Sequence, residues 1–569
     1  MTSESLNSSQ EDIREHAQRR TRMQGQEGTP YAARVAAGAA AASSSFFPLG
    51  YREGFSQWWA RLPAAAAEHK VLSYLPYLHH QPPTHLQTGN LAGFPNGSTP
   101  DSLQAADRNQ QGEISTNSLN DPYGPRRWSS SMVELTGKDR ALNEFSVERV
   151  GEEADQHLVM LHGYGAGLGF FYKNFEPLSR LRGWQLHALD MLGMGRSTRP
   201  PFKIKAKERE EAIREAEAWF VDALEEWRIK RKIDRFTLLG HSLGGYMAVA
   251  YALKYPGHLN KLILASPVGI PEDPYAVTAD VPEPSQSTLA NEMTQDQRDI
   301  TSSAAVPGST PKTADGSFIT GRNPEPGAES RPPRRNMPKW FAYLWDANIS
   351  PFSLVRWTGP LGPRIVSGWT SRRFSHLPAE EAKALHDYSY SIFSQRGSGE
   401  YALAYILAPG AFARSPLIRR IHGVGRQMID ADNSPLPNPA TTSPSSCSIF
   451  SKSSVLSAAP ETPPAETSPS AAPQAPAPRR EKGLPIVFMY GDHDWMDVSG
   501  GHDAANRLEE EKQRVLANAT PEERQNDQGS SKVVVINRAG HHLYLDGWEE
   551  FNKVVLSEME EVNRRERGA

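Results

Sequence analysis

The sequence predicts an α/β fold: a mainly parallel, doubly wound sheet with an inserted helical cap and disordered insertions. Three observations carry this prediction. Short apolar runs alternate with amphipathic helical patterns over residues 131–277 and again over 483–569, as in parallel sheets with helices on both faces. A small-residue turn surrounds Ser242 between a predicted strand and a predicted helix. An aspartate and a histidine follow, each after a further predicted strand.

Composition excludes several classes of protein. The chain has 569 residues and a formal net charge of -4, which argues against a general nucleic-acid-binding surface. Its single cysteine, Cys447, excludes an internal disulfide and favours a reducing compartment or an organelle matrix. No zinc or haem spacing occurs, so we expect no metal and no bound cofactor. No stretch approaches the roughly 20 uncharged apolar residues of a membrane-spanning helix.

Residues 1–130 are predicted to be an extension of the folded core. Arginines followed by an Ala/Ser-rich run resemble a mitochondrial transit peptide, although acidic residues are interspersed. The segment is too long and polar for a signal peptide, so we expect no secretion. Residues 46–78 are aromatic and apolar, which leaves two interpretations open: contact with a membrane headgroup layer, or a helix docked on the core. Residues 81–127 predict a disordered linker.

The first half of the core is predicted over 131–277. After two strand-like runs, a buried strand at 157–161 ends in the turn HGYGAG, which begins at His162. An HG-x-G turn at this place in the chain supplies one oxyanion-hole amide in hydrolases. We predict that this amide belongs to Tyr164, with Gly165 as the alternative.

A helix over 170–182 and a strand over 185–189 lead to a Gly-x-Gly at Gly193 and Gly195. A dinucleotide fingerprint requires G-x-G-x-x-G at the start of a helix, and the prolines that follow stop any helix here. We therefore predict a structural turn and no phosphate site. The charged segment 207–230 predicts a helix with one buried apolar stripe.

The stretch Gly240-His241-Ser242-Leu243-Gly244 fits the G-x-S-x-G nucleophile elbow. In this turn the serine backbone is strained, and the flanking glycines leave room for the neighbouring strand and helix. We predict Ser242 as the nucleophile and the Leu243 amide as the second oxyanion donor. A small-residue turn that contains a serine by chance is the alternative.

The alternation of strands and helices stops after the strand at 261–265. Residues 278–337 predict a disordered insertion, residues 338–431 are aromatic and helical, and residues 432–482 predict a Pro/Ala/Ser-rich linker. A helical segment inserted here predicts a cap over the nucleophile, with an apolar pocket for an acyl chain. The same rings also suit the cap's own core.

The core resumes over residues 483–569. A strand at 484–490 leads into a loop with three aspartates, and a strand at 532–536 leads into a pair of histidines. A final helix then buries its apolar face. The chain order serine, aspartate, histidine is that of the α/β-hydrolase triad, whose members stand at strand ends.

Ser242, Asp494 and His541 form the predicted triad. A serine hydroxyl is a poor nucleophile at neutral pH, so the imidazole takes its proton and the carboxylate orients the ring. His541 is preferred as the base because it follows Gly540 at the strand end. His542 is expected to line the pocket.

The acid is chosen among three aspartates in one loop. Asp494 is preferred because it stands three residues past Gly491, at the place of the acid in the G-x-x-D pattern. Asp492 is expected to satisfy backbone amides of the turn, and Asp497 to cap the next helix.

Several stretches together resemble one branch of the α/β-hydrolase family. They are HGYGAGLGFFYKNF, DMLGMGRSTRP, GHSLGGY, PFSLVRWTGPLGPRIV in the predicted cap, SGEYA and AGHHLYLD. The branch contains the mammalian co-activator of triglyceride lipase, plant lysophosphatidate acyltransferase relatives and fungal cardiolipin-specific deacylases. The resemblance implies a phospholipid or lysophospholipid substrate. It also implies attachment to a lipid surface. This surface is either a mitochondrial membrane, such as the inner membrane, or a lipid droplet in the cytoplasm.

This resemblance leaves three functions open. The first is a serine acyl hydrolase of glycerophospholipids, with cardiolipin deacylation for acyl-chain remodelling as its most concrete form. The second is an acyltransferase with acyl-CoA as co-substrate, since the family's H-x4-D motif matches His541 to Asp546, although Asp546 also suits a structural role. The third is a non-catalytic scaffold that regulates a lipase. The co-activator has asparagine where this chain has Ser242, so the serine favours an enzyme.

Overall fold

The computed structural model describes residues 48–77, 114–115, 121–272, 348–408, 412–429 and 479–568. The insertion predicted over 278–337 lies outside these residues. Most of the linker predicted over 432–482 also lies outside them.

A nine-stranded sheet forms the centre of the molecule, in the order β1-β2-β3-β5-β4-β6-β7-β10-β11. All pairs from β5 to β11 are parallel, whereas β1, β2 and β3 pair in antiparallel fashion at one edge. The predicted mainly parallel sheet is therefore confirmed. The strands are β1 (Ile114–Ser115), β2 (Arg126–Glu134), β3 (Ala141–Arg149), β4 (Gln156–Leu161), β5 (Trp184–Leu189), β6 (Phe236–His241), β7 (Leu259–Ala265), β10 (Pro485–Gly491) and β11 (Ser530–Ile536).

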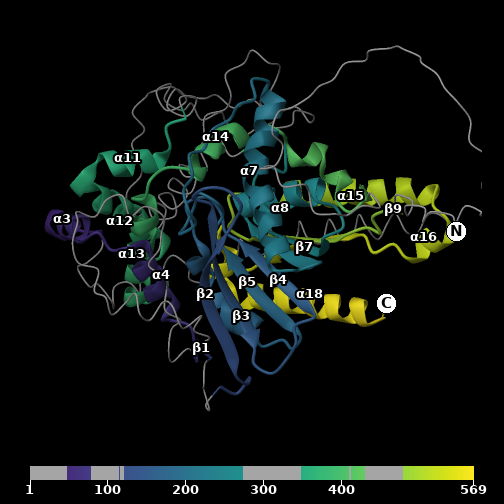
Figure 1. The fold of residues 1–569 in the computed structure, drawn as a ribbon, viewed down its shortest axis with the longest axis horizontal. Helices are drawn as coiled ribbons and strands as arrows, with labels where there is room; N and C mark the ends of the chain where they lie inside the picture. The colour runs from purple at the N-terminus through teal and green to yellow at the C-terminus, as the bar shows by residue number, and fades with distance from the viewer. Residues whose placement is uncertain are drawn as a thin grey trace, which may run out of the picture.

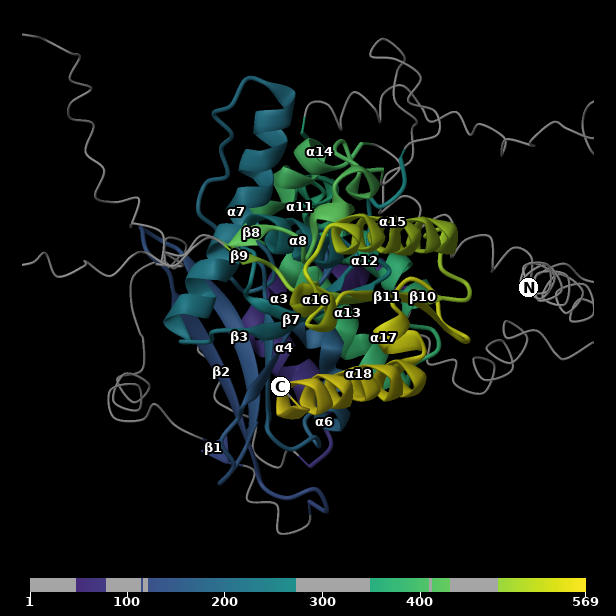
Figure 2. The same ribbon diagram turned by 90° about the vertical axis from the view of Figure 1, so that its right-hand side faces the viewer.

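Helices cover both faces of this sheet (Figures 1 and 2). On one face α7, α8 and α15 contribute to one buried apolar cluster, and on the other α6, α17 and α18 contribute to a second. This is the doubly wound arrangement. The helices are α6 (Tyr172–Leu178), α7 (Arg209–Lys230), α8 (Leu243–Lys254), α15 (Val498–Ala517), α16 (Pro521–Gln525), α17 (Leu543–Asp546) and α18 (Trp548–Gly568).

Several elements differ from their predicted bounds, and β1 lies wholly inside the linker predicted over 81–127. The strand β2 begins at Arg126, inside the predicted linker, because this arginine is buried in an ion pair with Asp121. The helix predicted over 170–182 is divided into the 3-10 helix η1 (Leu168–Phe171) and α6, which ends at Leu178 just after an internal proline. An interior proline weakens a helix by removing one backbone donor.

The cap consists of α11 (Pro351–Trp357), α12 (Gly362–Arg373), α13 (Ala379–Phe393) and α14 (Leu403–Ile406), with the 3-10 helices η2 (Gly359–Leu361) and η3 (Gly399–Ala402). Four short elements complete the described chain: η4 (Leu417–Arg419), η5 (Ile421–Gly423) and the antiparallel pair β8 (Met428–Ile429) and β9 (Arg479–Arg480).

Two N-terminal helices pack against the cap. Helix α3 (Tyr51–Ala60) contacts α12 and η2, and α4 (Ala64–Leu72) contacts α13. Figure 1 shows both helices in purple beside the green cap. Because α4 buries Ala65, Ala67 and Val71, the docked-helix interpretation of the aromatic segment holds for α4. Helix α3 leaves several rings in solvent.

Candidate active site

Ser242 forms the turn between β6 and α8. Its backbone has φ 52° and ψ -116°, a conformation that a non-glycine residue adopts only where its surroundings enforce it. A Cβ on Gly240 would lie 2.3 Å from the carbonyl oxygen of Gly244, and one on Gly244 would lie 2.6 Å from that of Leu161 in β4. The two glycines therefore let strand, turn and helix approach closely enough to hold the strained serine.

His541 lies between Ser242 and Asp494. Its Nε2 is 3.0 Å from the Ser242 hydroxyl oxygen, and its Nδ1 is 3.1 Å from Oδ1 of Asp494. Both distances are within hydrogen-bond reach, so proton transfer from the hydroxyl to the ring requires no rearrangement. The structure thus brings together the three side chains singled out in the sequence.

The neighbouring aspartates have other partners. Oδ1 of Asp492 accepts the amide hydrogen of Ala539 at 2.9 Å, and Asp497 accepts that of Ser499 at the start of α15. The first joins the loop after β10 to the loop after β11, 47 positions away, and the second is a helix cap. Asp497 thus has the role expected from the sequence, and Asp492 satisfies a backbone amide that belongs to the other loop.

Asp494 is held by two donors besides His541. The amide of Met496 donates to Oδ1 at 3.0 Å, and the hydroxyl of Ser266 donates to Oδ2. Ser266 follows β7 with φ 46°, an uncommon value for serine. The sequence analysis missed Ser266, because a serine before a proline in a turn carries no signal of its own.

His241 is a second residue that sequence reasoning missed. Its Nε2 donates to the main-chain carbonyl of His541 at 3.0 Å. Burial holds the pKa of His241 well below its usual range, and the nearby His541 acts in the same direction. The ring therefore stays neutral, and its hydrogen bond connects the turn around Ser242 to the backbone of His541.

The predicted oxyanion loop, residues 162–168, lies against the nucleophile. A Cβ on Gly163 would lie 3.0 Å from Cβ of Ser242. Within the described ranges, neither the Tyr164 amide nor the Gly165 amide donates a hydrogen bond. The Leu243 amide opens α8 and so has no acceptor within the helix. All three predicted donors are thus available to a ligand.

His542 and Asp546 bind the cap. Arg373 of α12 donates from Nε to Nδ1 of His542 at 2.9 Å, and from both terminal nitrogens to the Asp546 carboxylate at 3.0 and 3.2 Å. Asp546 also accepts the Gly540 amide hydrogen at 3.2 Å. Burial and the charge of Arg373 hold the pKa of His542 well below its usual range, so its ring is neutral and accepts. The H-x4-D aspartate therefore fastens the cap to the loop that carries His541.

The cap closes over the site. Phe352 of α11 stacks on Tyr164 with ring centroids 4.9 Å apart, and on Phe393 of α13 at 4.4 Å. Ser242 is 3% exposed and His541 6%. The nucleophile and the base are therefore almost fully covered in this structure. Across the described part of the chain, no group of three or more metal-ligating side chains lies together.

Comparison with known proteins places this geometry in context. The family model described as alpha/beta hydrolase fold matches residues 156–355. A 1-acylglycerol-3-phosphate O-acyltransferase of Arabidopsis thaliana is 35% identical over 305 residues, which cover 52% of this chain and 58% of that protein. The 1-acylglycerol-3-phosphate O-acyltransferase ABHD5 of Homo sapiens is 46% identical over 269 residues, which cover 46% of this chain and 58% of the relative.

A third relative is aligned over more of the chain. The (lyso)-N-acylphosphatidylethanolamine lipase of Bos taurus is 30% identical over 403 residues, which cover 70% of this chain and 77% of the lipase. Against the two acyltransferases, by contrast, the chain spans 58% of the relative's length.

Asp494→Asn and Asp492→Asn form a matched pair for the acid. We expect Asp494→Asn to lower kcat on a soluble ester about 10⁴-fold, as loss of the orienting carboxylate does in serine hydrolases. Asp492→Asn weakens a contact between the loops after β10 and β11, so we expect a lower melting temperature with kcat retained. Steady-state kinetics and thermal unfolding of both variants check this, and the reverse pattern would mean that Asp492 is the acid.

Ser266→Ala tests the newly found support of the acid. The variant removes one of three donors to Asp494, so we expect kcat to fall about tenfold, in line with ~1.5 kcal/mol for a hydrogen bond to a charged group. KM should not change, since Ser266 is 0% exposed and its hydroxyl is bound to Asp494. A kcat equal to that of the wild type, measured with the same ester, would show that the contact has no catalytic consequence.

Proposed function

Because the chain belongs to the α/β-hydrolase family, in the branch with the plant and mammalian 1-acylglycerol-3-phosphate O-acyltransferases and the (lyso)-N-acylphosphatidylethanolamine lipase, we propose that it is a serine acyl hydrolase of glycerophospholipids. The single observation that carries the proposal is the Ser242 hydroxyl 3.0 Å from His541, which is itself bound to Asp494. A scaffold without catalysis has no need for this arrangement.

The reaction proceeds through an acyl-enzyme. Ser242 attacks the ester carbonyl while His541 takes its proton, and Asp494 orients the ring and stabilises the imidazolium. The amides of Tyr164 and Leu243 donate to the oxyanion that forms. His541 then returns the proton to the leaving lysolipid oxygen. Finally His541 deprotonates a water, which attacks the acyl-enzyme and releases the fatty acid.

The substrate class is supported by the relatives and by the cap. Both kinds of relative are named for glycerolipids that carry a phosphate group, and Phe352 of the cap stacks on Tyr164 in the predicted oxyanion loop. Removal of an acyl chain from cardiolipin, in mitochondria and during acyl-chain remodelling, is the most specific form of the proposal. Its support is the sequence resemblance to cardiolipin-specific deacylases.

Acyl transfer is a second candidate, and the names of the acyltransferase relatives favour it. If lysophosphatidate replaces water as the acceptor, the same acyl-enzyme chemistry gives phosphatidate, with acyl-CoA as the acyl donor. The H-x4-D aspartate adds little support, because Asp546 is occupied by Arg373. The acceptor therefore decides between the two activities.

We also propose that the protein attaches peripherally to a lipid surface through α3. Tyr51, Phe55 and Trp59 recur every fourth residue on one side of this helix and are 69%, 50% and 73% exposed. Exposed Leu354 and Trp357 stand on α11, and η2, which α3 contacts, adds an exposed leucine. Rings with an apolar body and a polar edge suit the headgroup layer.

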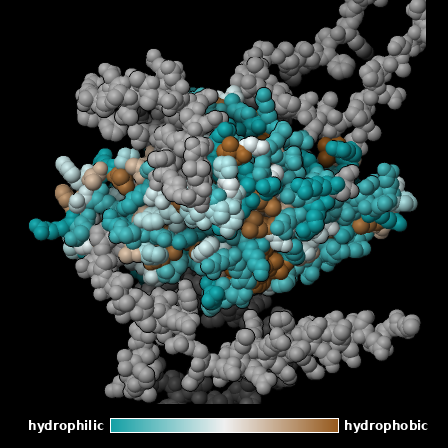
Figure 3. Space-filling model, turned by 90° about the horizontal axis from the view of Figure 1, so that it is seen from below, coloured by the Kyte–Doolittle hydropathy of each residue, from teal (hydrophilic) through white to brown (hydrophobic). Residues whose placement is uncertain are grey.

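The face shown in Figure 3 is mostly hydrophilic, with brown side chains in small groups at its left-hand end, across its centre and at its right-hand end. None of the helices in the described ranges combines the length and apolar character that crossing a bilayer requires. Attachment by α3 therefore needs no spanning segment.

Ser242→Ala tests the enzyme proposal. Purified protein is incubated with phospholipids labelled in the acyl chain, including cardiolipin, with and without lysophosphatidate and acyl-CoA. We expect labelled fatty acid from a glycerophospholipid, and a loss of at least about 10³-fold in Ser242→Ala because the nucleophile is absent. Label in phosphatidate instead would establish acyl transfer. Equal turnover by the wild type and Ser242→Ala would refute the mechanism.

Phe55→Ala/Trp59→Ala tests the attachment surface. We expect liposome affinity to fall at least about tenfold, since burying one such ring contributes ~1.5 kcal/mol or more, while kcat on a soluble ester is retained. Met428→Ala, which shortens an exposed apolar side chain on β8, is the matched control. Flotation with phosphatidylcholine/cardiolipin vesicles measures the affinities, and an equal loss in the control would contradict the role of α3.

A further inference from the structure

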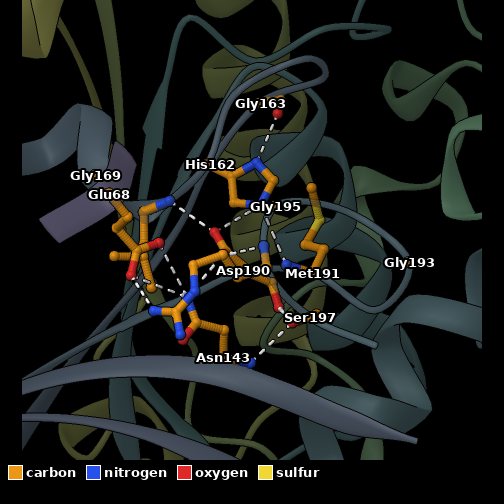
Figure 4. A network of polar contacts seen from close by, with 12 residues as sticks. Glu68, Asn143, His162, Gly163, Gly169, Asp190, Met191, Gly193, Gly195 and Ser197 are labelled. Carbon is orange, nitrogen blue, oxygen red and sulfur yellow. Dashed lines mark hydrogen bonds and ion pairs between the residues drawn. The ribbon is translucent and has the colours of Figure 1, made fainter. Parts of the chain in front are cut away.

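A buried polar network joins the N-terminal segment, the sheet and the cap (Figure 4). At its centre is Glu68 of α4, which is 0% exposed. Its carboxylate accepts from Arg196 Nη1 at 2.5 Å, from Asn143 Nδ2 at 3.1 Å and from the hydroxyl of Tyr388 at 3.1 Å. Arg196 stands after β5, Asn143 in β3 and Tyr388 in cap helix α13. One carboxylate thus connects three parts of the fold.

The network continues to Asp190, a second buried carboxylate. Asn143 Nδ2 and the Arg196 amide donate to Oδ2 of Asp190 at 2.8 and 2.7 Å. A Cβ on Gly195 would lie 2.2 Å from the Asp190 carboxyl carbon, and Gly195 has φ 50°. The Gly-x-Gly turn is therefore needed so that the backbone can wrap this carboxylate, as expected for a structural turn.

The oxyanion loop is fixed by this network at its far end. The Leu168 amide donates to Oδ1 of Asp190 at 2.7 Å. The Gly169 amide donates at 3.3 Å to the Tyr388 hydroxyl, which itself donates to Glu68. The Asp190 carboxylate thus binds the Leu168 amide directly. The Glu68 carboxylate holds the next amide, that of Gly169, through the Tyr388 hydroxyl.

The near end of the loop is fixed by His162. Its Nε2 accepts the amide hydrogen of Met191 at 3.2 Å, and its Nδ1 donates to the Gly163 carbonyl at 2.7 Å. Burial lowers the pKa of His162 to about 4, so the ring is neutral and keeps this tautomer. Tyr164 stands between the two anchored ends, so a displacement of either end changes the position of its amide.

The buried charges make Glu68 hard to replace. Burial raises the pKa of both Glu68 and Asp190, and Arg196 opposes this effect at each of them. Glu68→Gln removes the negative charge beside the buried guanidinium of Arg196 and leaves one acceptor oxygen where Arg196 and Tyr388 now use two. The hydrogen bonds of Arg196 and Tyr388 must then change. Both residues also support the oxyanion loop, since Arg196 contacts Asp190 and Tyr388 accepts from the Gly169 amide.

We propose that Glu68 is a positioning residue for the oxyanion hole: through Arg196, Asn143 and Tyr388 it holds the anchors that keep the Tyr164 amide beside Ser242. The inference rests on the proposed serine acyl hydrolase chemistry at Ser242. It makes α4 part of the support of the active site. Three residues separate α4 from α3. The proposed lipid-binding helix is therefore linked directly to the helix that supports the oxyanion hole.

The test is Glu68→Gln in the full chain, with Glu225→Gln as the matched control. Glu225 is also buried and also accepts from an arginine and a tyrosine, Arg228 and Tyr251, but it lies in α7. We measure kcat and KM on a soluble ester, the inhibition constant of an acyl trifluoromethyl ketone, whose bound oxyanion occupies the hole, and the melting temperature.

For Glu68→Gln we expect kcat and ketone affinity each to fall about ten- to hundredfold with little change in KM, as when an oxyanion donor is misplaced. Glu225→Gln should lose a similar amount of thermal stability and keep kcat within about twofold, because its contacts do not reach the loop. A merely structural role for Glu68 would move the melting temperature alone.

A kcat for Glu68→Gln within about twofold of the wild type, or an equal fall in Glu225→Gln, would overturn the inference while leaving the proposed chemistry intact. An inactive wild-type protein would instead overturn the chemistry, and the inference with it. If Glu68→Gln does not fold, Tyr388→Phe gives the same test, because it removes the hydroxyl between Glu68 and the Gly169 amide. An unchanged kcat in that variant overturns the inference too.

Discussion

The site depends on one constraint: the parallel strands of the sheet all end on the same side, so that their carboxyl ends lie next to one another. Ser242 and His541 are 299 positions apart in the chain, and His541 and Asp494 are 47 apart. They meet because β6, β10 and β11 all run in one direction and end at one edge. The strand ends approach very closely: a Cβ on Gly491 would lie 2.2 Å from the carbonyl oxygen of Ala539. Because the backbones of the loops that carry Asp494 and His541 are in contact, the two side chains lie close enough to form a hydrogen bond.

Charged contacts then attach the remaining layers to this edge. Arg373 joins the cap to Asp546, beside the base, and Glu68 joins the N-terminal segment to the cap and to the turn after β5. The Glu68–Arg196 contact is buried and the Arg373–Asp546 contact is partly buried, and a buried ion pair gives geometric specificity as long as its donors and acceptors are paired. Two contacts therefore hold the cap on the rest of the fold, one near His541 and one near the oxyanion loop.

The sequence predicts the fold and the reacting groups because their signals are local. The alternation of elements, the glycines of the elbow and the order of the three triad members can each be read from short windows. Even the contact of Asp497 at the start of α15 follows from cap chemistry. The supporting residues have no such signal. Glu68 stands in an alanine-rich helix and resembles a surface charge, and its partners Arg196 and Tyr388 are 128 and 320 positions away. Ser266, His241 and Arg373 acquire their positions only through tertiary contacts, so no local pattern marks them.

The most direct measurement of the central claim is the site of covalent modification by a fluorophosphonate, mapped by peptide mass spectrometry on the folded protein. A triad of Ser242, His541 and Asp494 predicts one adduct, on the peptide that contains Ser242, which forms far more slowly when His541 is replaced by alanine. Adduct on another serine, or no adduct on a folded and otherwise unmodified chain, would contradict it.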